Sequence, residues 1–416
     1  MDWSKGMDRS LKRFLTAVIC LALFITVGCK KEEQKNLDKE GFCTDISVFE
    51  CIHGRSFCDK GMVQIEEGLM IFYEYETGRS YPLCSNAYCE HLPYDEVTNP
   101  DPVCEATMKE LKTACVYDDF VYTIQSTGIQ EITIQARNLK ESGYRTVATL
   151  PYCQTFSTQG YNAIIGDKAY LLLAEIDNLK EDEFVLSYTS NDLYTYLVEL
   201  DLNTGEYKPL FHIEGEDKYK ILQTVYGEEG VYCRWYYEDI ETSEDFTDFT
   251  VNDYHEAFYY VAYDGSEVKE LCPELVEVTS FGGDVPMTVM VAGISEIGAY
   301  LPNAEQTAVE CYYYDGNKET VFELPEGYNW LSVSGVGEDF ILMTFMTPEK
   351  TYETVGFDLT TDQLTIQKDS EYITYSAVCD GAFWKHCSDE TGEYRELWLY
   401  EDIFSEAGKP LLSVRE

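Results

Sequence analysis

The chain has 416 residues, of which 45% are hydrophobic and 25% are charged, a composition typical of a globular protein with a large core. Its 30 Lys and Arg residues stand against 76 Asp and Glu residues, so the formal net charge at pH 7 is −46. Because nucleic-acid binding needs clustered cations, this balance argues against a nucleic-acid partner. The acidity indicates either solubility through self-repulsion or binding of cationic partners.

The N-terminus has the pattern of an export signal. Residues 14–27 form an apolar run of 14 residues, which is short for a membrane-spanning helix of about 20 residues. Four basic residues precede this run: Lys5, Arg9, Lys12 and Arg13. The run ends in Thr-Val-Gly-Cys29, which resembles a bacterial lipobox. Residues 1–28 are therefore predicted to be a lipoprotein signal peptide and Cys29 the lipidation site, the alternative being an ordinary signal peptide or an uncleaved anchor.

Residues 29–42 are predicted to be an acylated cysteine followed by a flexible tether, because residues 30–40 are polar and lack a strand pattern. The paired chains of a diacylglyceryl cysteine anchor a protein stably, whereas one acyl chain binds only marginally. The expected location is the outer face of the cell membrane, and the expected membrane contact is the N-terminal diacylglyceryl cysteine. Residues 43–416 are predicted to form a single domain.

Two turn patterns alternate along residues 60–416. One pattern is a hairpin with a Gly- or Asp-centred turn. In the other, an apolar residue is followed by a short Gly/Asp turn and then by an aromatic strand, as in residues 116–122. Turns of the first kind fall at Gly78, Gly143, Gly205, Gly265, Gly316, Asp362 and Gly408. Such turns between alternating runs are strong hairpin signals. Two turns per unit give about four strands, which is the blade of a β-propeller.

The sequence therefore predicts an all-β protein, a β-propeller of seven blades with about four antiparallel strands each. Six or eight blades are the alternatives, because the unit near residues 281–316 lacks a clear first turn. Two long acidic segments, 178–191 and 241–253, lie between the two turn patterns of their units. They are expected to emerge on the same side of the propeller and to be candidate binding loops.

Three cysteines and a histidine follow the first hairpin closely: Cys84, Cys89, His91 and Cys104. Three thiolates and an imidazole are the ligands of a closed tetrahedral metal site, and their softness favours Zn²⁺ or Fe²⁺ over Ca²⁺ or Mg²⁺. The alternative is disulfide bonding among the three cysteines, as expected in an exported protein with 13 cysteines after Cys29. A metal here would be structural, since all four ligands come from the protein.

The segment Pro-Leu-Cys84…Cys89-x-His91…Cys104, directly after a Thr-Gly hairpin, resembles a group of uncharacterised β-propeller lipoproteins of anaerobic Gram-positive bacteria. Members of that group are similar in having a lipobox, a knuckle of this pattern and a predicted propeller. The resemblance implies a cell-surface propeller without an established activity. An anaerobic origin would weaken the disulfide alternative.

The sequence favours a binding module for a protein, peptide or glycan, and leaves a propeller hydrolase or lyase acting on polysaccharide or peptide at the central channel as the alternative. No zinc-protease, serine-hydrolase, phosphate-loop or dinucleotide motif is present, so no cofactor site is predicted and catalytic residues are not assigned. His212, His255 and His386 stand alone and are expected to be structural or exposed. Acids or a histidine converging at the channel mouth would favour the enzyme.

Overall fold

The computed structural model describes most of residues 46–415. Outside the described residues lie 1–45, 51–53, 87, 110, 155–159, 178–179, 183–184, 188–191, 216–217, 243–248, 281–290, 338–339, 362, 367–374, 378–381, 390–391, 400–401, 403–407 and 416. The predicted signal peptide, Cys29 and the predicted tether all fall in the first of these ranges. No helix among the described residues is long and apolar enough to cross a membrane.

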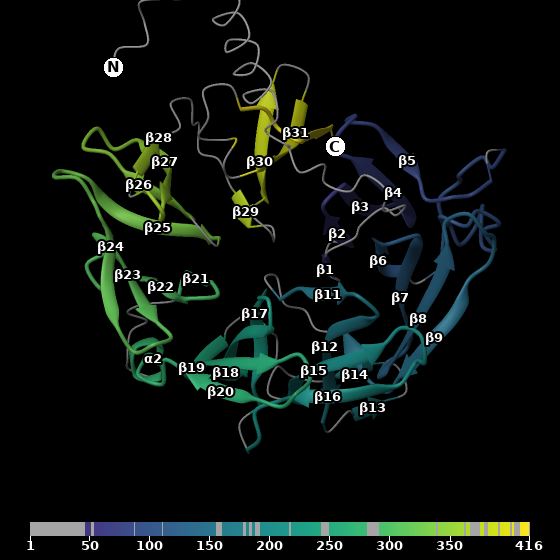
Figure 1. The fold of residues 1–416 in the computed structure, drawn as a ribbon, viewed down its shortest axis with the longest axis horizontal. Coiled ribbons are helices and arrows are strands. Elements are labelled where there is room, and N and C mark those ends of the chain that lie inside the picture. Colours follow the sequence, from purple (N-terminus) through teal and green to yellow (C-terminus); the bar gives the residue numbers. More distant parts are fainter. Residues whose placement is uncertain are drawn as a thin grey trace, which may run out of the picture. The chain divides into compact units, whose positions relative to one another are not determined.

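Within the described residues, the strands form seven antiparallel groups of four, and in each group every strand is hydrogen-bonded to the next (Figure 1). The first blade contains β2 (Arg55–Cys58), β3 (Gly61–Glu66), β4 (Leu69–Glu74) and β5 (Ser80–Pro82). The second contains β6 (Leu111–Tyr117), β7 (Phe120–Gly128), β8 (Glu131–Asn138) and β9 (Arg145–Leu150). The third contains β11 (Asn162–Ile165), β12 (Lys168–Ile176), β15 (Leu193–Asp201) and β16 (Tyr207–Phe211). The fourth contains β17 (Lys220–Tyr226), β18 (Gly230–Thr242), β19 (Phe249–Ala262) and β20 (Val268–Leu271).

The fifth blade contains β21 (Gly293–Ile294), β22 (Gly298–Pro302), β23 (Ala308–Tyr313) and β24 (Lys318–Glu323). The sixth contains β25 (Asn329–Val336), β26 (Phe340–Met346), β27 (Tyr352–Asp358) and β28 (Gln363–Ile366). The seventh contains β29 (Tyr375–Ala377), β30 (Ala382–Asp389), β31 (Gly392–Leu399) and β32 (Leu412–Arg415). Smaller elements are β10 (Cys153–Gln154), which pairs with β12, the hairpin of β13 (Lys180–Asp182) and β14 (Val185–Ser187), and the helix α2 (Leu275–Thr279).

The turns read from the sequence connect these strands. The marks at 78, 143, 205, 265, 316 and 408 each fall between the third and fourth strands of one blade. The mark at 362 lies outside the described residues, between β27 and β28 in the sequence. Gly205 shows why glycine is required: its φ is +74°, and a Cβ there would lie 2.3 Å from the carbonyl oxygen of Val147 in the second blade. The first turn that the fifth unit lacked in the sequence is Ser295–Gly298, closed by a hydrogen bond from Ser295 N to Gly298 O of 2.9 Å. The prediction of seven blades is confirmed.

Among the described residues, buried apolar clusters join each of the first six blades to its neighbour. Between the first and second blades, for example, Phe72 and Val63 pack with Val116 and Val121. The last blade is joined to the first in the same way, because Leu397 of β31 shares a cluster with residues of β2 to β4. Within the described residues no ladder links these two blades, and the contact seen between them in this cluster is side-chain packing.

One strand was not expected from the turn patterns. Strand β1 (Ile46–Glu50) pairs with β2 of the first blade on one side and with β11 of the third blade on the other. It also contacts β6, the first strand of the second blade. Phe49 of this strand is 1% exposed and packs among residues of the second and third blades. The first described strand of the chain thus ties three blades together.

Candidate metal centre

The cysteines and histidine lie on the connection between β5 and β6, which leaves the fourth strand of the first blade. Met70 of β4 holds both ends of this connection: its carbonyl oxygen accepts from Leu83 N at 3.0 Å, and its N–H donates to Ala106 O at 2.8 Å. Leu83 precedes Cys84 and Ala106 follows Cys104 by two residues. A single strand residue therefore brings the two ends of the cysteine-containing loop together.

Hydrogen bonds inside the loop define its shape. The carboxylate of Asp95 accepts from the backbone N–H groups of Val97 and Thr98, at 3.0 and 2.6 Å, and these bonds lower the pKa of Asp95. The side-chain amide of Asn99 donates to the carbonyl oxygen of Pro93 at 2.7 Å. The hydroxyl of Thr107 donates to the carbonyl oxygen of Leu92 at 2.9 Å. The loop is thus ordered by its own side chains as well as by its closed base.

The four predicted ligands converge within this loop. Their ligand atoms, from Cys84, Cys89, His91 and Cys104, all lie within 4.8 Å of one another. Cys104 Sγ lies 3.6 Å from His91 Nδ1. One sulfur and one nitrogen bound to the same tetrahedral Zn²⁺ would be about 3.6 Å apart, and two sulfurs about 3.8 Å. The arrangement is close to that of a zinc site and needs only a small contraction to become one.

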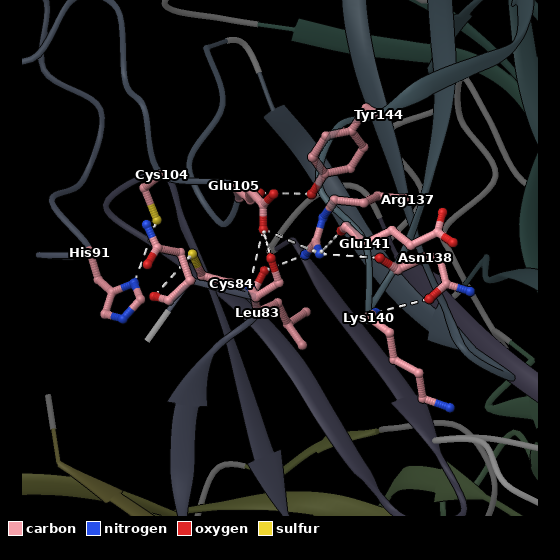
Figure 2. Close-up of polar contacts among 12 residues, drawn as sticks. Leu83, Cys84, His91, Cys104, Glu105, Arg137, Asn138, Lys140, Glu141 and Tyr144 are labelled. Carbon is pink, nitrogen blue, oxygen red and sulfur yellow. Dashed lines mark hydrogen bonds and ion pairs between the residues drawn. The ribbon is translucent and has the colours of Figure 1, made fainter. Parts of the chain in front are cut away.

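The donor chemistry also fits a soft divalent metal. All three cysteines are free thiols in the structure. Burial raises the pKa of the Cys104 thiol to about 12, so a bound cation would be needed to hold this group as a thiolate. The backbone N–H of His91 points at Cys89 Sγ at 3.4 Å, where it would stabilise a thiolate. His91 itself has a φ of +51°, a left-handed conformation that turns its ring towards Cys104 (Figure 2).

Arg137 of β8 fastens the loop to the second blade (Figure 2). Its guanidinium is 1% exposed and donates to the carbonyl oxygen of Leu83 at 2.5 Å, and it forms an ion pair with Glu105 at 3.5 Å. Tyr144 lies against the guanidinium, 5.3 Å from ring centre to Cζ, and donates its hydroxyl to the Glu105 carbonyl oxygen at 2.8 Å. The residues beside Cys84 and Cys104 are thus both held by one buried cation.

Glu105 completes this arrangement from the other side. Its carboxylate accepts hydrogen bonds from the backbone N–H and the hydroxyl of Ser85, at 3.0 and 2.6 Å. Burial alone would raise the pKa of Glu105, but the Ser85 hydrogen bonds and the Arg137 charge outweigh it and leave that pKa below its usual value. Glu105 is therefore ionised at neutral pH and links Ser85 to Arg137.

A second group of titratable residues lies at one end of the fourth blade. The hydroxyl of Tyr219, the residue before β17, shares a hydrogen bond of 2.5 Å with His255 Nε2. A carboxylate oxygen of Asp253 lies 3.8 Å from His255 Nδ1 on the other side of the ring. Tyr237 pairs with His255 across β18 and β19, with ring centres 5.0 Å apart. The sequence had indicated that His255 stands alone. In the structure it lies between a phenol and a carboxylate.

The other site residues of the sequence analysis are distributed as follows. His212 packs its ring on Tyr196, 4.7 Å between centres, at the end of β16. The side chain of His386 and the predicted lipidation residue Cys29 lie outside the described residues. Arg137 and Tyr219 were not found from the sequence, because an arginine or tyrosine within a strand carries no local signal of its partner.

No protein-family model matches the sequence, and no curated protein matches it. Among solved structures, the chain is similar to prolyl oligopeptidase B from Galerina marginata, with 10% identity, a TM-score of 0.49, and coverage of 100% of this chain and 57% of that one. It is also similar to an acylaminoacyl peptidase from Pyrococcus horikoshii, with 14% identity, a TM-score of 0.38, and coverage of 68% and 43%. The chain thus spans about half the length of these two peptidases.

A third similar structure is the β-propeller domain of the Trilobed protease from Pyrococcus furiosus, with 14% identity and a TM-score of 0.33. The alignment covers 70% of this chain and 80% of that domain. At these levels of identity the similarity concerns the fold alone.

Proposed function

We propose that this protein is an extracellular β-propeller, tethered to the outer face of the cell membrane through a diacylated Cys29, that acts as a binding module for a protein, peptide or glycan. The observation that carries the proposal is the place of the cysteine–histidine cluster. It stabilises a loop that leaves the outer strand of the first blade, and ordered loops on a rigid scaffold are where propellers and other β-proteins bind partners.

In this proposal Cys84, Cys89, His91 and Cys104 hold one structural Zn²⁺, or Fe²⁺ under reducing conditions. The metal would supply a cross-link between the two ends of the loop, and no chemistry is assigned to it, since four protein ligands leave no position for a substrate. Arg137 and Glu105 fix the backbone beside the first and last ligands. The metal would therefore hold the loop from within, and the Arg137–Glu105 ion pair would hold the backbone beside its two ends.

The tether is tested with the full-length chain produced in a Gram-positive host supplied with labelled palmitate. The wild-type protein should incorporate the label and remain with membranes. Cys29→Ser should incorporate none and should be released to the medium or retained as precursor, whereas Cys20→Ser, in the apolar run, should behave as wild type. Equal membrane retention and labelling of Cys29→Ser would reject the tether.

A specific observation also supports the enzymatic alternative. Tyr219, His255 and Asp253 form a phenol–imidazole–carboxylate series, the order of groups in a proton relay. Tyr219 directly precedes β17, the first strand of its blade, and first strands of successive blades contact one another in several places, as β17 and β21 do. In a hydrolase or lyase, Tyr219 would pass its hydroxyl proton to His255 and take a proton from the substrate on the same oxygen, leaving His255 as an imidazolium that faces Asp253.

The two candidates are separated by turnover of chromogenic peptide and polysaccharide substrates. If the protein is a propeller hydrolase or lyase, Tyr219→Phe and His255→Gln should each lower kcat at least 100-fold without unfolding the protein, and Tyr237→Phe should lower it little. A wild-type protein without turnover on any of these substrates would favour the binding module.

A further inference from the structure

The cysteine-containing loop carries the most exposed large apolar side chains of the described residues. Tyr88 is 96% exposed, Val103 is 95% exposed and Val97 is 87% exposed. Leu92 of the same loop is half exposed. Outside the loop, the described residues hold four further exposed large apolar side chains, none more than 52% exposed: Ile129, Tyr207, Val268 and Ile297.

Exposed apolar side chains at this level cost solvation free energy unless a partner covers them, and folded chains rarely gather them on one short segment. A mobile segment could hide them by collapse, but this loop cannot. Its base is closed by Met70, its interior is ordered by Asp95 and Asn99, and its flank is held by Arg137. The loop thus presents its apolar side chains from a fixed frame.

The charged residues of residues 84–104 are all acidic: Glu90, Asp95, Glu96 and Asp101. No lysine or arginine lies between the two outer cysteines. Exposed apolar side chains and carboxylates on one loop complement a partner that offers apolar groups together with cations. It repels both a second copy of this acidic chain and an anionic membrane, since like charges across a contact are destabilising.

We propose that the loop 84–104 is a docking surface for a basic protein or peptide, with Tyr88, Val97 and Val103 as the apolar contacts and the four loop carboxylates as the surrounding charges. The inference rests on the proposed binding function and names its surface and the class of its partner. The cysteine–histidine cluster then has a role in binding, because it holds Cys89 and Cys104 next to Tyr88 and Val103. Metal loading and partner affinity should therefore change together.

The test measures binding of a synthetic leucine–lysine amphipathic peptide to the mature, zinc-loaded chain at physiological salt, by fluorescence anisotropy. Tyr88→Ser/Val97→Ser/Val103→Ser should weaken binding at least tenfold while zinc content stays unchanged. The matched control Ile129→Ser/Val268→Ser/Ile297→Ser, which removes exposed apolar groups elsewhere without changing charge, should bind as wild type. A leucine–glutamate peptide of the same pattern should not bind.

Two outcomes would overturn the proposal. Equal binding by the loop variant and wild type would show that the peptide is held by net charge alone. Binding of phosphatidylglycerol vesicles by wild type, abolished in the loop variant, would assign the surface to the membrane instead. Either outcome leaves the tether and the metal site standing, because those are tested separately by palmitate labelling and by metal analysis.

Discussion

The guanidinium of Arg137 donates a hydrogen bond of 2.5 Å to the carbonyl oxygen of Leu83, the residue before the first cysteine of the cluster. The two residues are 54 positions apart and belong to different blades. The contact is buried, and the same guanidinium faces Glu105, the residue after the last cysteine. The second blade thus holds both ends of the loop that Met70 of the first blade brings together.

Replacing Arg137 tests this relationship. Arg137→Met leaves the Leu83 carbonyl oxygen and the Glu105 carboxylate without their buried cation, so we expect a loss of about 2–3 kcal/mol in the free energy of unfolding. Because the flanks of the ligands are released, zinc affinity should fall about tenfold. Urea unfolding and competition with a zinc chelator measure the two effects. Arg79→Met, an exposed arginine beside the β4–β5 turn, is the control and should change neither.

Glu105 makes the stability of this region depend on pH. The pKa of Glu105 is lower in the folded chain than in the unfolded chain, so its contribution is fully present above the unfolded pKa of about 4.5 and is lost as pH falls through the folded pKa. Glu105→Gln should therefore be less stable than wild type by about 1 kcal/mol at pH 7. The difference should shrink as pH falls below the unfolded pKa of about 4.5.

The measurement is urea unfolding of both proteins from pH 7 to pH 3, and only their difference is interpreted, because acid also removes metal from both. Glu90→Gln, at an exposed carboxylate of the same loop, is the control. A difference between wild type and Glu105→Gln that is constant over this range would contradict the ionised pairing.

The strand β1 offers an independent test of the fold. Phe49 is buried at the junction of the second and third blades, so Phe49→Ala should lower the free energy of unfolding by about 3–5 kcal/mol. Ile46→Ala, on the same strand but partly exposed, should cost clearly less. If the two substitutions had equal and small effects, β1 would not tie the blades together as its pairing indicates.

The parts of the molecule that could be predicted are those encoded locally. Each blade can be recognised by turns such as that at Gly143, where a φ of +87° favours glycine and no distant atom lies within 4 Å of the added Cβ. The grouping of the four candidate ligands was predictable because thiol and imidazole groups close together in the sequence are typical metal donors. Two turns per unit and seven turn marks favoured seven blades, and the missing first turn of the fifth unit left six or eight open.

The parts that could not be predicted depend on residues far apart in the chain. Asn162 donates to the carbonyl oxygen of Phe49 across 113 positions, and nothing near either residue indicates the other. The same holds for Arg137 with Leu83 and for Tyr219 with His255. The fifth blade's first turn was missed because Ser295–Gly298 contains no Asp-Gly or Thr-Gly pair, although its hydrogen bonding is that of an ordinary hairpin.

The central claim is that Cys84, Cys89, His91 and Cys104 hold one metal ion, and metal analysis of the mature chain purified without oxidant tests it most directly. We expect about one Zn or Fe per chain that survives dialysis, and less than a tenth of that in Cys84→Ser and Cys104→Ser, whereas Cys153→Ser, a half-buried thiol of the third blade, should retain it. A wild-type chain without metal that carries a Cys84–Cys89 or Cys84–Cys104 disulfide would contradict the account.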